Sequence, residues 1–175
     1  HAWGGARVAG RRPEAAPAGA GQRGEQVLTV DSADAMEALG AAIAHEAPDG
    51  FTLFLSGQLA AGKTTLARGL VRALGHTGAV KSPTFTLVES YGLKSREVHH
   101  FDLYRIADPE ELEYIGLDEY FDGTALCIVE WPERGLASLP VADLELSLSV
   151  VPEGRRVAAL AKTAAGDAVL KKITN

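Results

Sequence analysis

The sequence predicts an α/β fold, and three observations support this prediction. Residues 51–57 form an apolar run rich in β-formers that ends at a glycine, and a helical pattern begins at Lys63. The run 125–129 is uninterrupted and apolar, as expected of a strand buried on both faces of a sheet. Residues 32–46 carry apolar side chains at helical spacing after a capping residue, Asp31 or Ser32. Strands and helices therefore alternate in the first half of the chain, which is typical of an α/β domain.

The other segments divide into expected helices and expected strands. Helices begin at capping residues and comprise 32–46, 63–74 (ended by Gly75) and two short helices between 108 and 121. Strands are short apolar or alternating runs bounded by turn residues and comprise 26–30, 51–57, 86–91, 97–103, 125–129, 143–151, 155–162 and 168–172. We expect 86–91 to pair with 97–103 as a hairpin, and 143–151 to pair antiparallel with 155–162.

Composition narrows the class of protein. The chain has 175 residues and a net charge of −6, which argues against a general nucleic-acid binder, so no direct contact with DNA is expected. Cys127 is the single cysteine, which excludes an intrachain disulfide and fits a reduced, cytoplasmic setting. No apolar run is long enough to span a bilayer. Residues 1–26, rich in Ala, Gly, Arg and Pro, are expected to be a disordered leader without a secretory signal, and 27–175 to be the folded domain.

A phosphate-binding motif follows the strand 51–57. Gly57 to Thr64 matches G-x-x-x-x-G-K-[ST], with a strand before it and a helix after it. Glycines let the backbone wrap around a phosphate, and its N–H groups form a nest at the positive end of the helix. Lys63 would reach the β- and γ-phosphates, and the Thr64 hydroxyl would bind Mg²⁺. The expected nucleotide-binding residues here are Gly57, Ala60, Ala61, Gly62, Lys63 and Thr64.

Acidic and hydroxyl side chains complete the predicted site. Glu130 directly follows the buried run and is the better candidate for the Mg²⁺-binding acid. Asp102 could position an attacking water or hold the metal through water, or it could cap a turn. Thr84 and Thr86 lie where switch segments occur, although strand-entry threonines would look the same. Trp131 could stack on a base or simply pack.

Further residues help to choose among nucleotide-binding proteins. His99 and His100 are adjacent, so they face opposite sides of a strand, and each is expected to be structural. No Asn-Lys-x-Asp base reader occurs, which favours ATP over GTP. A small-molecule kinase would need clustered lid arginines, whereas the downstream arginines are scattered at Arg105, Arg134, Arg155 and Arg156. A kinase, and a nucleotide-gated binding module without turnover, stay open as alternatives.

Several motifs together resemble a known family. Besides the phosphate loop, the chain contains Ser-Pro-Thr-Phe-Thr-Leu at 82–87, His-Phe-Asp-Leu-Tyr-Arg at 100–105 and Val-Glu-Trp-Pro at 129–132. In this order they resemble TsaE (YjeE), the bacterial ATPase family of tRNA threonylcarbamoyladenosine biosynthesis. The resemblance implies a P-loop NTPase-like three-layer α/β/α sandwich with a mixed central sheet. It also implies slow hydrolysis of ATP to ADP with Mg²⁺.

The resemblance assigns roles to residues and names partners. Thr64 and Glu130 would bind Mg²⁺, and Lys63 and Thr65 would bind the phosphates. Asp102 would take part in hydrolysis, and Trp131 would lie beside the nucleotide. A first switch segment would include Ser82, Thr84 and Thr86. Family members act with the threonylcarbamoyl transferase and its inactive paralogue, and contact tRNA only through that complex. The reaction they support is the t6A37 modification of tRNAs that read codons beginning with A. This chain departs from the family loop at Gln58, which replaces an acid, and at Ala60, which replaces a glycine. If the loop needs a positive φ at position 60, Ala60 is strained there.

Overall fold

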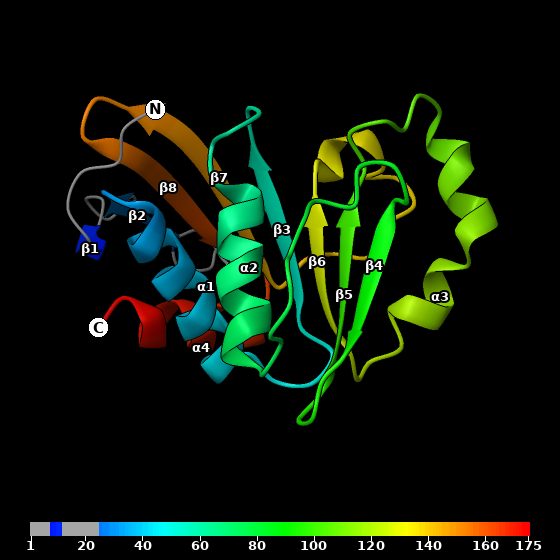
Figure 1. Ribbon diagram of the computed structural model, residues 1–175, viewed down its shortest axis with the longest axis horizontal. Helices are drawn as coiled ribbons and strands as arrows, with labels where there is room; N and C mark the ends of the chain where they lie inside the picture. Colours follow the sequence, from blue (N-terminus) through cyan, green and yellow to red (C-terminus); the bar gives the residue numbers. More distant parts are fainter. Residues whose placement is uncertain (1–7, 12–24) are drawn as a thin grey trace.

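The computed structural model describes residues 8–11 and 25–175, and within them the chain forms one mixed sheet flanked by helices (Figure 1). The described strands make an eight-stranded sheet in the order β1-β2-β8-β7-β3-β6-β5-β4. The strands are β1 (Val8–Arg11), β2 (Glu25–Val30), β3 (Thr52–Gly57), β4 (Val88–Gly92), β5 (Glu97–Asp102), β6 (Leu126–Glu130), β7 (Leu144–Val151) and β8 (Gly154–Ala161). The α/β fold and the mixed sheet predicted from the sequence are confirmed.

The described residues also form α-helices and short 3₁₀ helices. They are α1 (Ala33–Glu46), α2 (Lys63–Ala73), α3 (Leu117–Tyr120) and α4 (Ala164–Ile173), with 3₁₀ helices η1 (Pro109–Ile115) and η2 (Pro132–Arg134). No helix within the described part of the chain combines the length and apolar character needed to cross a membrane.

Parallel pairing is confined to the centre of the sheet. Strand β3 pairs parallel with both β6 and β7, and β5 pairs parallel with β6, whereas the other neighbours are antiparallel. The predicted hairpin β4–β5 and the predicted antiparallel pair β7–β8 are both confirmed. The carboxyl ends of β3, β5 and β6 consequently lie at the same edge of the sheet.

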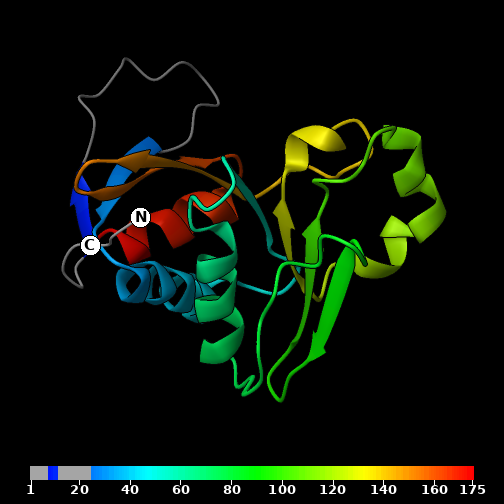
Figure 2. The ribbon, with the colours of Figure 1, turned by 45° about the horizontal axis from the view of Figure 1, so that its top comes forward.

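Two hydrophobic clusters hold the layers together. Helices α1, α2 and α4 pack on one side of the sheet, where Met36, Leu66 and Leu170 are fully buried among strand residues (Figure 2). A smaller cluster around Phe101 and Cys127 fills the other face beneath η1 and α3. Of the two helical layers of the predicted sandwich, the one on this face is therefore small, because in the described part of the chain it consists of these short helices.

The prediction of a last strand at 168–172 is wrong, because these residues belong to helix α4. Thr163 caps that helix by accepting a hydrogen bond from the Gly166 N–H at 3.1 Å, and Asp167 and Lys171 form an i,i+4 ion pair at 2.9 Å. A three-residue apolar stretch does not distinguish a strand from a helix face, so the capping threonine was the better signal. Gly166 lies inside the helix against the Asp143 backbone.

Other boundaries shift by one or two residues. The strand predicted from residue 86 begins at Val88, because residues 84–86 form a turn and Leu87 has a positive φ of 69°. Within the predicted leader, Val8–Arg11 forms β1 and pairs antiparallel with β2. The rest of that segment, residues 1–7 and 12–24, lies outside the described residues, so the division into leader and domain stays a prediction.

Backbone contact between α1 and α2 depends on glycine. A Cβ built on Gly69 of α2 would lie 2.0 Å from the Glu37 carbonyl oxygen, and one built on Gly40 of α1 would lie 2.0 Å from that of Leu66. The two helices therefore approach more closely than side chains would permit. This contact fixes α2, whose first residue is Lys63 of the phosphate loop.

We predict that Gly69→Ala lowers the free energy of unfolding by about 1–3 kcal/mol, because the added methyl group forces α1 and α2 apart. In an open helix position the same change would raise stability by about 1 kcal/mol. Gly92→Ala is the control, since its Cβ meets nothing within 4 Å. Urea unfolding that left Gly69→Ala as stable as Gly92→Ala would contradict this packing.

We predict that Cys127, which is 1% exposed, makes the free energy of unfolding depend on pH at alkaline pH. Burial, the largest cause, raises the pKa of Cys127 from 9.0 to about 12. The neutral thiol stabilises the fold below pH 9, and this contribution is lost between pH 9 and 12 as the thiol ionises first in the unfolded chain. Over this range the free energy of unfolding should fall more steeply in the wild type than in Cys127→Ala, by about 1.4 kcal/mol per pH unit. Equal slopes in the two proteins would contradict it.

Candidate phosphate-binding site

The candidate site forms where three parallel strands end. Strand β3 ends at Gly57, β5 at Asp102 and β6 at Glu130, and the register aligns Leu55 with Glu130 and Glu130 with Asp102. Backbone bonds fix these ends, because the Trp131 N–H donates to the Leu55 carbonyl at 3.2 Å. Pairing of adjacent strands therefore brings together two acids, Asp102 and Glu130, that lie far apart in the sequence.

The loop 57–62 connects β3 to the N-terminus of α2. Gly57 and Gly62 have φ of 143° and 113°, and Ala60 has φ of 65°, so the left-handed conformation on which the expected strain depended is present. A Cβ at Gly57 would lie 2.4 Å from the Leu148 carbonyl, so the chain passes too close to β7 for any other residue. The loop thus places the first N–H groups of α2 around a cavity.

Lys63 is held inside the loop. Its Nζ donates to the Gly57 carbonyl and to the Gln58 carbonyl, the latter at 2.9 Å, and lies 4.4 Å from the centre of the Trp131 ring. Burial, the largest cause, lowers the pKa of the Lys63 ammonium, and the carboxylates of Glu130 and Asp102 oppose this. A buried ammonium has lost most of its hydration, so direct contact with an anion would stabilise its charged form.

Glu130 contacts the helix start and a histidine. It is 2% exposed, and its Oε2 lies 3.1 Å from Thr64 Oγ1 and 2.6 Å from His100 Nε2. A carboxylate only accepts hydrogen bonds, so the imidazole donates from Nε2. His100 Nδ1 then has no hydrogen-bond partner in the described structure. His100 was expected to be structural, but this bond places it directly behind the candidate metal ligand.

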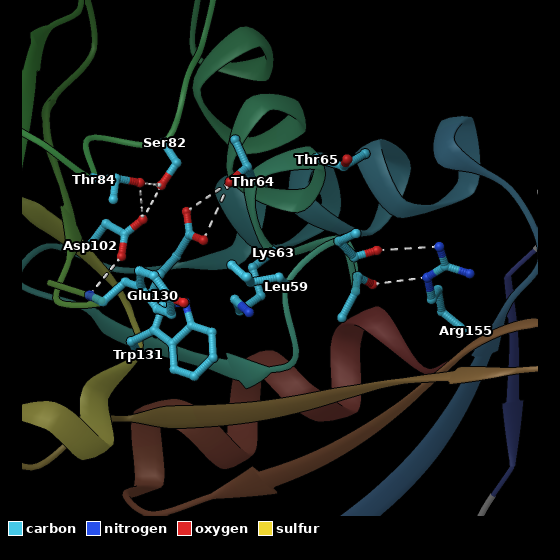
Figure 3. A pocket seen from close by; sticks show the side chains of 14 residues that line it. Leu59, Lys63, Thr64, Thr65, Ser82, Thr84, Asp102, Glu130, Trp131 and Arg155 are labelled. Carbon is cyan, nitrogen blue, oxygen red and sulfur yellow. Dashed lines mark hydrogen bonds between the residues drawn. The ribbon is translucent and has the colours of Figure 1, made fainter. Parts of the chain in front are cut away.

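Asp102 holds the predicted switch loop. Its Oδ2 accepts hydrogen bonds from Ser82 Oγ and from Thr84 Oγ1, the latter at 2.9 Å, and its Oδ1 accepts from the Tyr104 N–H at 2.9 Å (Figure 3). Thr86 instead lines a second cavity of 360 Å³, which Ser82 also lines. The loop 82–86 therefore borders both cavities.

Aromatic residues form one wall. The ring of Trp131 lies 4.9 Å from that of Tyr104, and the guanidinium of Arg134 lies 5.5 Å from the Tyr104 ring. Trp131 has a positive φ of 58°, which is costly for a bulky residue and typical of functional sites. Both rings are half-buried and line the cavity, so stacking of Trp131 on a base stays a prediction.

The cavity has a volume of 440 Å³, within the usual range for small-ligand sites. Its lining comprises Leu59, Ala60, Ala61, Gly62, Lys63, Thr64, Thr65, Ser82, Thr84, Asp102, Tyr104, Glu130, Trp131 and Arg155. Of the predicted site residues, Gly57 and Thr86 do not line it. Arg155, described above only as one of the scattered arginines, and Tyr104, which was not named as a site residue, do line it. Tyr104 belongs to the motif at 100–105, which was a signal for it, whereas the position of Arg155 depends on how β8 pairs in the sheet.

The donor set fits Mg²⁺. The described residues contain no group of three or more His, Cys, Asp or Glu side chains that could hold a metal alone. Mg²⁺ is usually bound by one or two protein oxygens together with phosphate oxygens and water. The Thr64 hydroxyl and the Glu130 carboxylate, 3.1 Å apart, supply such a pair.

This fold and site define an α/β protein of the P-loop class: a glycine-containing loop leads from a parallel strand into a helix, with an acid at the end of the adjacent strand. Residues 30–157 match the family model "Threonylcarbamoyl adenosine biosynthesis protein TsaE". The chain belongs to this family.

Individual relatives agree with the family model. The chain is 44% identical over 123 residues to a tRNA threonylcarbamoyladenosine biosynthesis protein TsaE of Haemophilus influenzae, covering 70% of this chain and 78% of that one. It is 40% identical over 110 residues to the Bacillus subtilis protein of the same name, covering 63% and 68%. The crystal structure of Bacillus subtilis YdiB superposes with a TM-score of 0.72 at 28% identity, covering 86% of this chain and 93% of that chain.

We predict that His100 orients Glu130 toward bound metal. Replacing His100 by Leu removes the donor and should raise the Mg²⁺ concentration needed for half-maximal nucleotide turnover by about 10–100-fold, as for other residues that orient metal ligands. His100→Gln retains an N–H near the Nε2 position and should recover part of the loss. His99→Gln, on the opposite side of β5, is the control. An unchanged Mg²⁺ requirement in His100→Leu would show that this bond does not position Glu130.

Proposed function

We propose that this protein binds ATP with Mg²⁺ at the cavity, hydrolyses it slowly to ADP and phosphate, and thereby supports tRNA threonylcarbamoyladenosine formation. The observation that carries the proposal is the convergence of Lys63, Thr64 and Glu130 at the start of α2, with Glu130 bonded to Thr64. Membership in the TsaE family, and the relatives named as tRNA threonylcarbamoyladenosine biosynthesis proteins, support the tRNA modification. The proposed setting is the cytoplasm, where that modification machinery works on tRNA.

Each residue has a role in this proposal. The loop N–H groups and Lys63 would hold the β- and γ-phosphates, with Thr65 assisting at the helix start. Thr64 and Glu130 would hold Mg²⁺, which when bound neutralises phosphate charge. Asp102 would accept a hydrogen bond from the attacking water, after releasing the hydroxyl groups of Ser82 and Thr84.

The same contacts suggest a switch. In the structure Ser82 and Thr84 both donate to Asp102 Oδ2, so this oxygen is not available to orient water until they leave. Release of these hydroxyl groups toward a γ-phosphate would move the loop 82–86. Phe85 in this loop is 81% exposed and stacks on Arg105 at 4.1 Å, so its position would report the nucleotide state to a partner. We propose the threonylcarbamoyl transferase with its inactive paralogue as that partner.

A nucleotide-gated module without turnover is the second candidate. Ala60 in a left-handed conformation and Gln58 in place of the family acid are the observations that favour it. A small-molecule kinase has less support, because Arg155 faces the loop carbonyls instead of forming a lid. Phosphate release above background from ATP and Mg²⁺ separates the proposed ATPase from the module, and phosphoryl transfer to nucleosides or sugars would identify a kinase.

We predict that Glu130→Ala lowers the rate of phosphate release about a hundredfold, because charge stabilisation at the transferred phosphate is lost. Binding of ADP without Mg²⁺ should change little, since Lys63 and the loop remain. Glu113→Ala, an exposed acid of η1, is the control. Full turnover in Glu130→Ala, measured by a phosphate-release assay, would remove Glu130 from the mechanism.

The partner proposal has its own experiment. Immobilised protein should retain the transferase heterodimer, and retention should differ between ATP and ADP. Lys63→Ala should abolish that difference. Equal retention with either nucleotide would leave the switch without support, even if hydrolysis occurs.

A further inference from the structure

A buried arginine contacts the phosphate loop from the side away from Glu130 (Figure 3). Arg155 is the second residue of β8 and is 2% exposed. Its Nε donates to the Ala61 carbonyl at 3.1 Å, its Nη2 to the Ala60 carbonyl at 3.3 Å, and its Nη1 to the Gly154 carbonyl at 2.9 Å. A guanidinium is costly to bury unless it is hydrogen-bonded, and these carbonyls provide the bonds.

The pairing of strand β8 with both of its neighbours fixes the backbone position of Arg155. Arg155 is aligned with Val30 of β2 and with Val150 of β7, so β8 is paired on both sides at this position. Gly154 precedes it with φ of 137°, and a Cβ there would lie 2.5 Å from the Val30 carbonyl. The guanidinium therefore comes from a rigid part of the sheet, whereas the loop it contacts lies between two elements.

The two hydrogen bonds determine which way the loop peptides face. In a trans peptide the C=O and the following N–H point in opposite directions. Because Arg155 holds the Ala61 carbonyl, the Gly62 N–H points to the opposite side of that peptide. The Ala60–Ala61 peptide is fixed at both ends, since its carbonyl accepts from Arg155 and its N–H donates to the Gln58 carbonyl at 3.2 Å.

These bonds act where the loop is strained. Ala60 has φ of 65°, a conformation that a glycine adopts freely and an alanine adopts at a cost. An alanine released from its restraints would move to negative φ and rotate the adjoining peptides. The arginine and the Gln58 carbonyl are the restraints that oppose this rotation.

We propose that Arg155 is a positioning residue for phosphate binding: it clamps the Ala60 and Ala61 carbonyls and keeps the strained loop in the conformation that turns its N–H groups to the ligand. This inference rests on the proposed nucleotide-binding function. It predicts an energetic coupling between Arg155 and Ala60, which a purely electrostatic effect of the arginine on bound phosphate would not produce.

The test is a double-mutant cycle with ADP affinity as the readout, by calorimetry without Mg²⁺. Arg155→Met should weaken ADP binding about tenfold or more, the effect of losing charged hydrogen bonds. In the Ala60→Gly background the same substitution should change the logarithm of the ADP dissociation constant by less than half as much, because glycine keeps the left-handed conformation without the bonds from Arg155. Arg155→Lys keeps the charge but not the forked bonds, and should not restore wild-type affinity.

Arg156→Met is the matched control, because Arg156 is the next residue of β8 and is exposed. It should bind ADP as the wild type does. Thermal unfolding of each nucleotide-free variant checks the fold, and if Arg155→Met does not fold, Arg155→Lys takes its place in the cycle.

Two results would overturn the inference alone. One is an unchanged ADP affinity in Arg155→Met, and the other is an equal loss of affinity on that substitution in the wild-type and Ala60→Gly backgrounds. A wild type that fails to bind ADP would instead overturn the proposed function, and the inference with it.

Discussion

Parallel pairing of β6 with β3 and β5 is the constraint on which the rest of the structure depends. It brings Gly57, Asp102 and Glu130 to one edge of the sheet, although they come from distant parts of the sequence. The close glycine-mediated contact between α1 and α2 then fixes the helix that begins at Lys63. Strand β8 contributes from the other side, where Arg155 reaches the loop carbonyls. The sheet therefore positions the acids and Arg155, and the loop with the start of α2 supplies the rest of one side of the cavity lining.

The functional side chains are bonded to one another in the structure. Glu130 is bonded to His100 and Thr64, Asp102 to the switch hydroxyl groups, and Lys63 to loop carbonyls. Such bonds offset the cost of burying charge and keep each group in place. In the proposed function a ligand would replace the bonds of Lys63, Thr64 and Asp102 with phosphate, metal and water contacts, whereas the bond between His100 and Glu130 would remain. Of the described residues, the non-glycine ones with positive φ all border this region: Ala60, Leu87 and Trp131. Backbone strain at a binding site is a common arrangement, and here it coincides with the loop, the switch and the aromatic wall.

Local signals were enough for most of the fold. The motif with its flanking strand and helix, the buried run before Glu130 and the two antiparallel pairs were all predicted correctly. Helix α4 was missed because its apolar stretch is short, and the threonine cap at Thr163 was not given enough weight. His100 was placed on the correct strand but was not linked to Glu130. Its contact depends on the register of β5 against β6, which no local pattern encodes.

The sequence by itself predicted the α/β class, the candidate phosphate loop and the acids that end β5 and β6, because each prediction depends on residues that are close together in the chain. It also indicated the backbone strain at Ala60, since an alanine stands where the family has a glycine. Only the tertiary structure decided that Arg155 lies against this loop, that His100 bonds to Glu130 and that Thr86 does not line the cavity that Ser82 and Thr84 line. The physical reason is that strand order and register bring together groups far apart in the chain, such as the Arg155 side chain and the Ala60 carbonyl, which are 95 positions apart. Such contacts leave no periodicity or motif in the sequence.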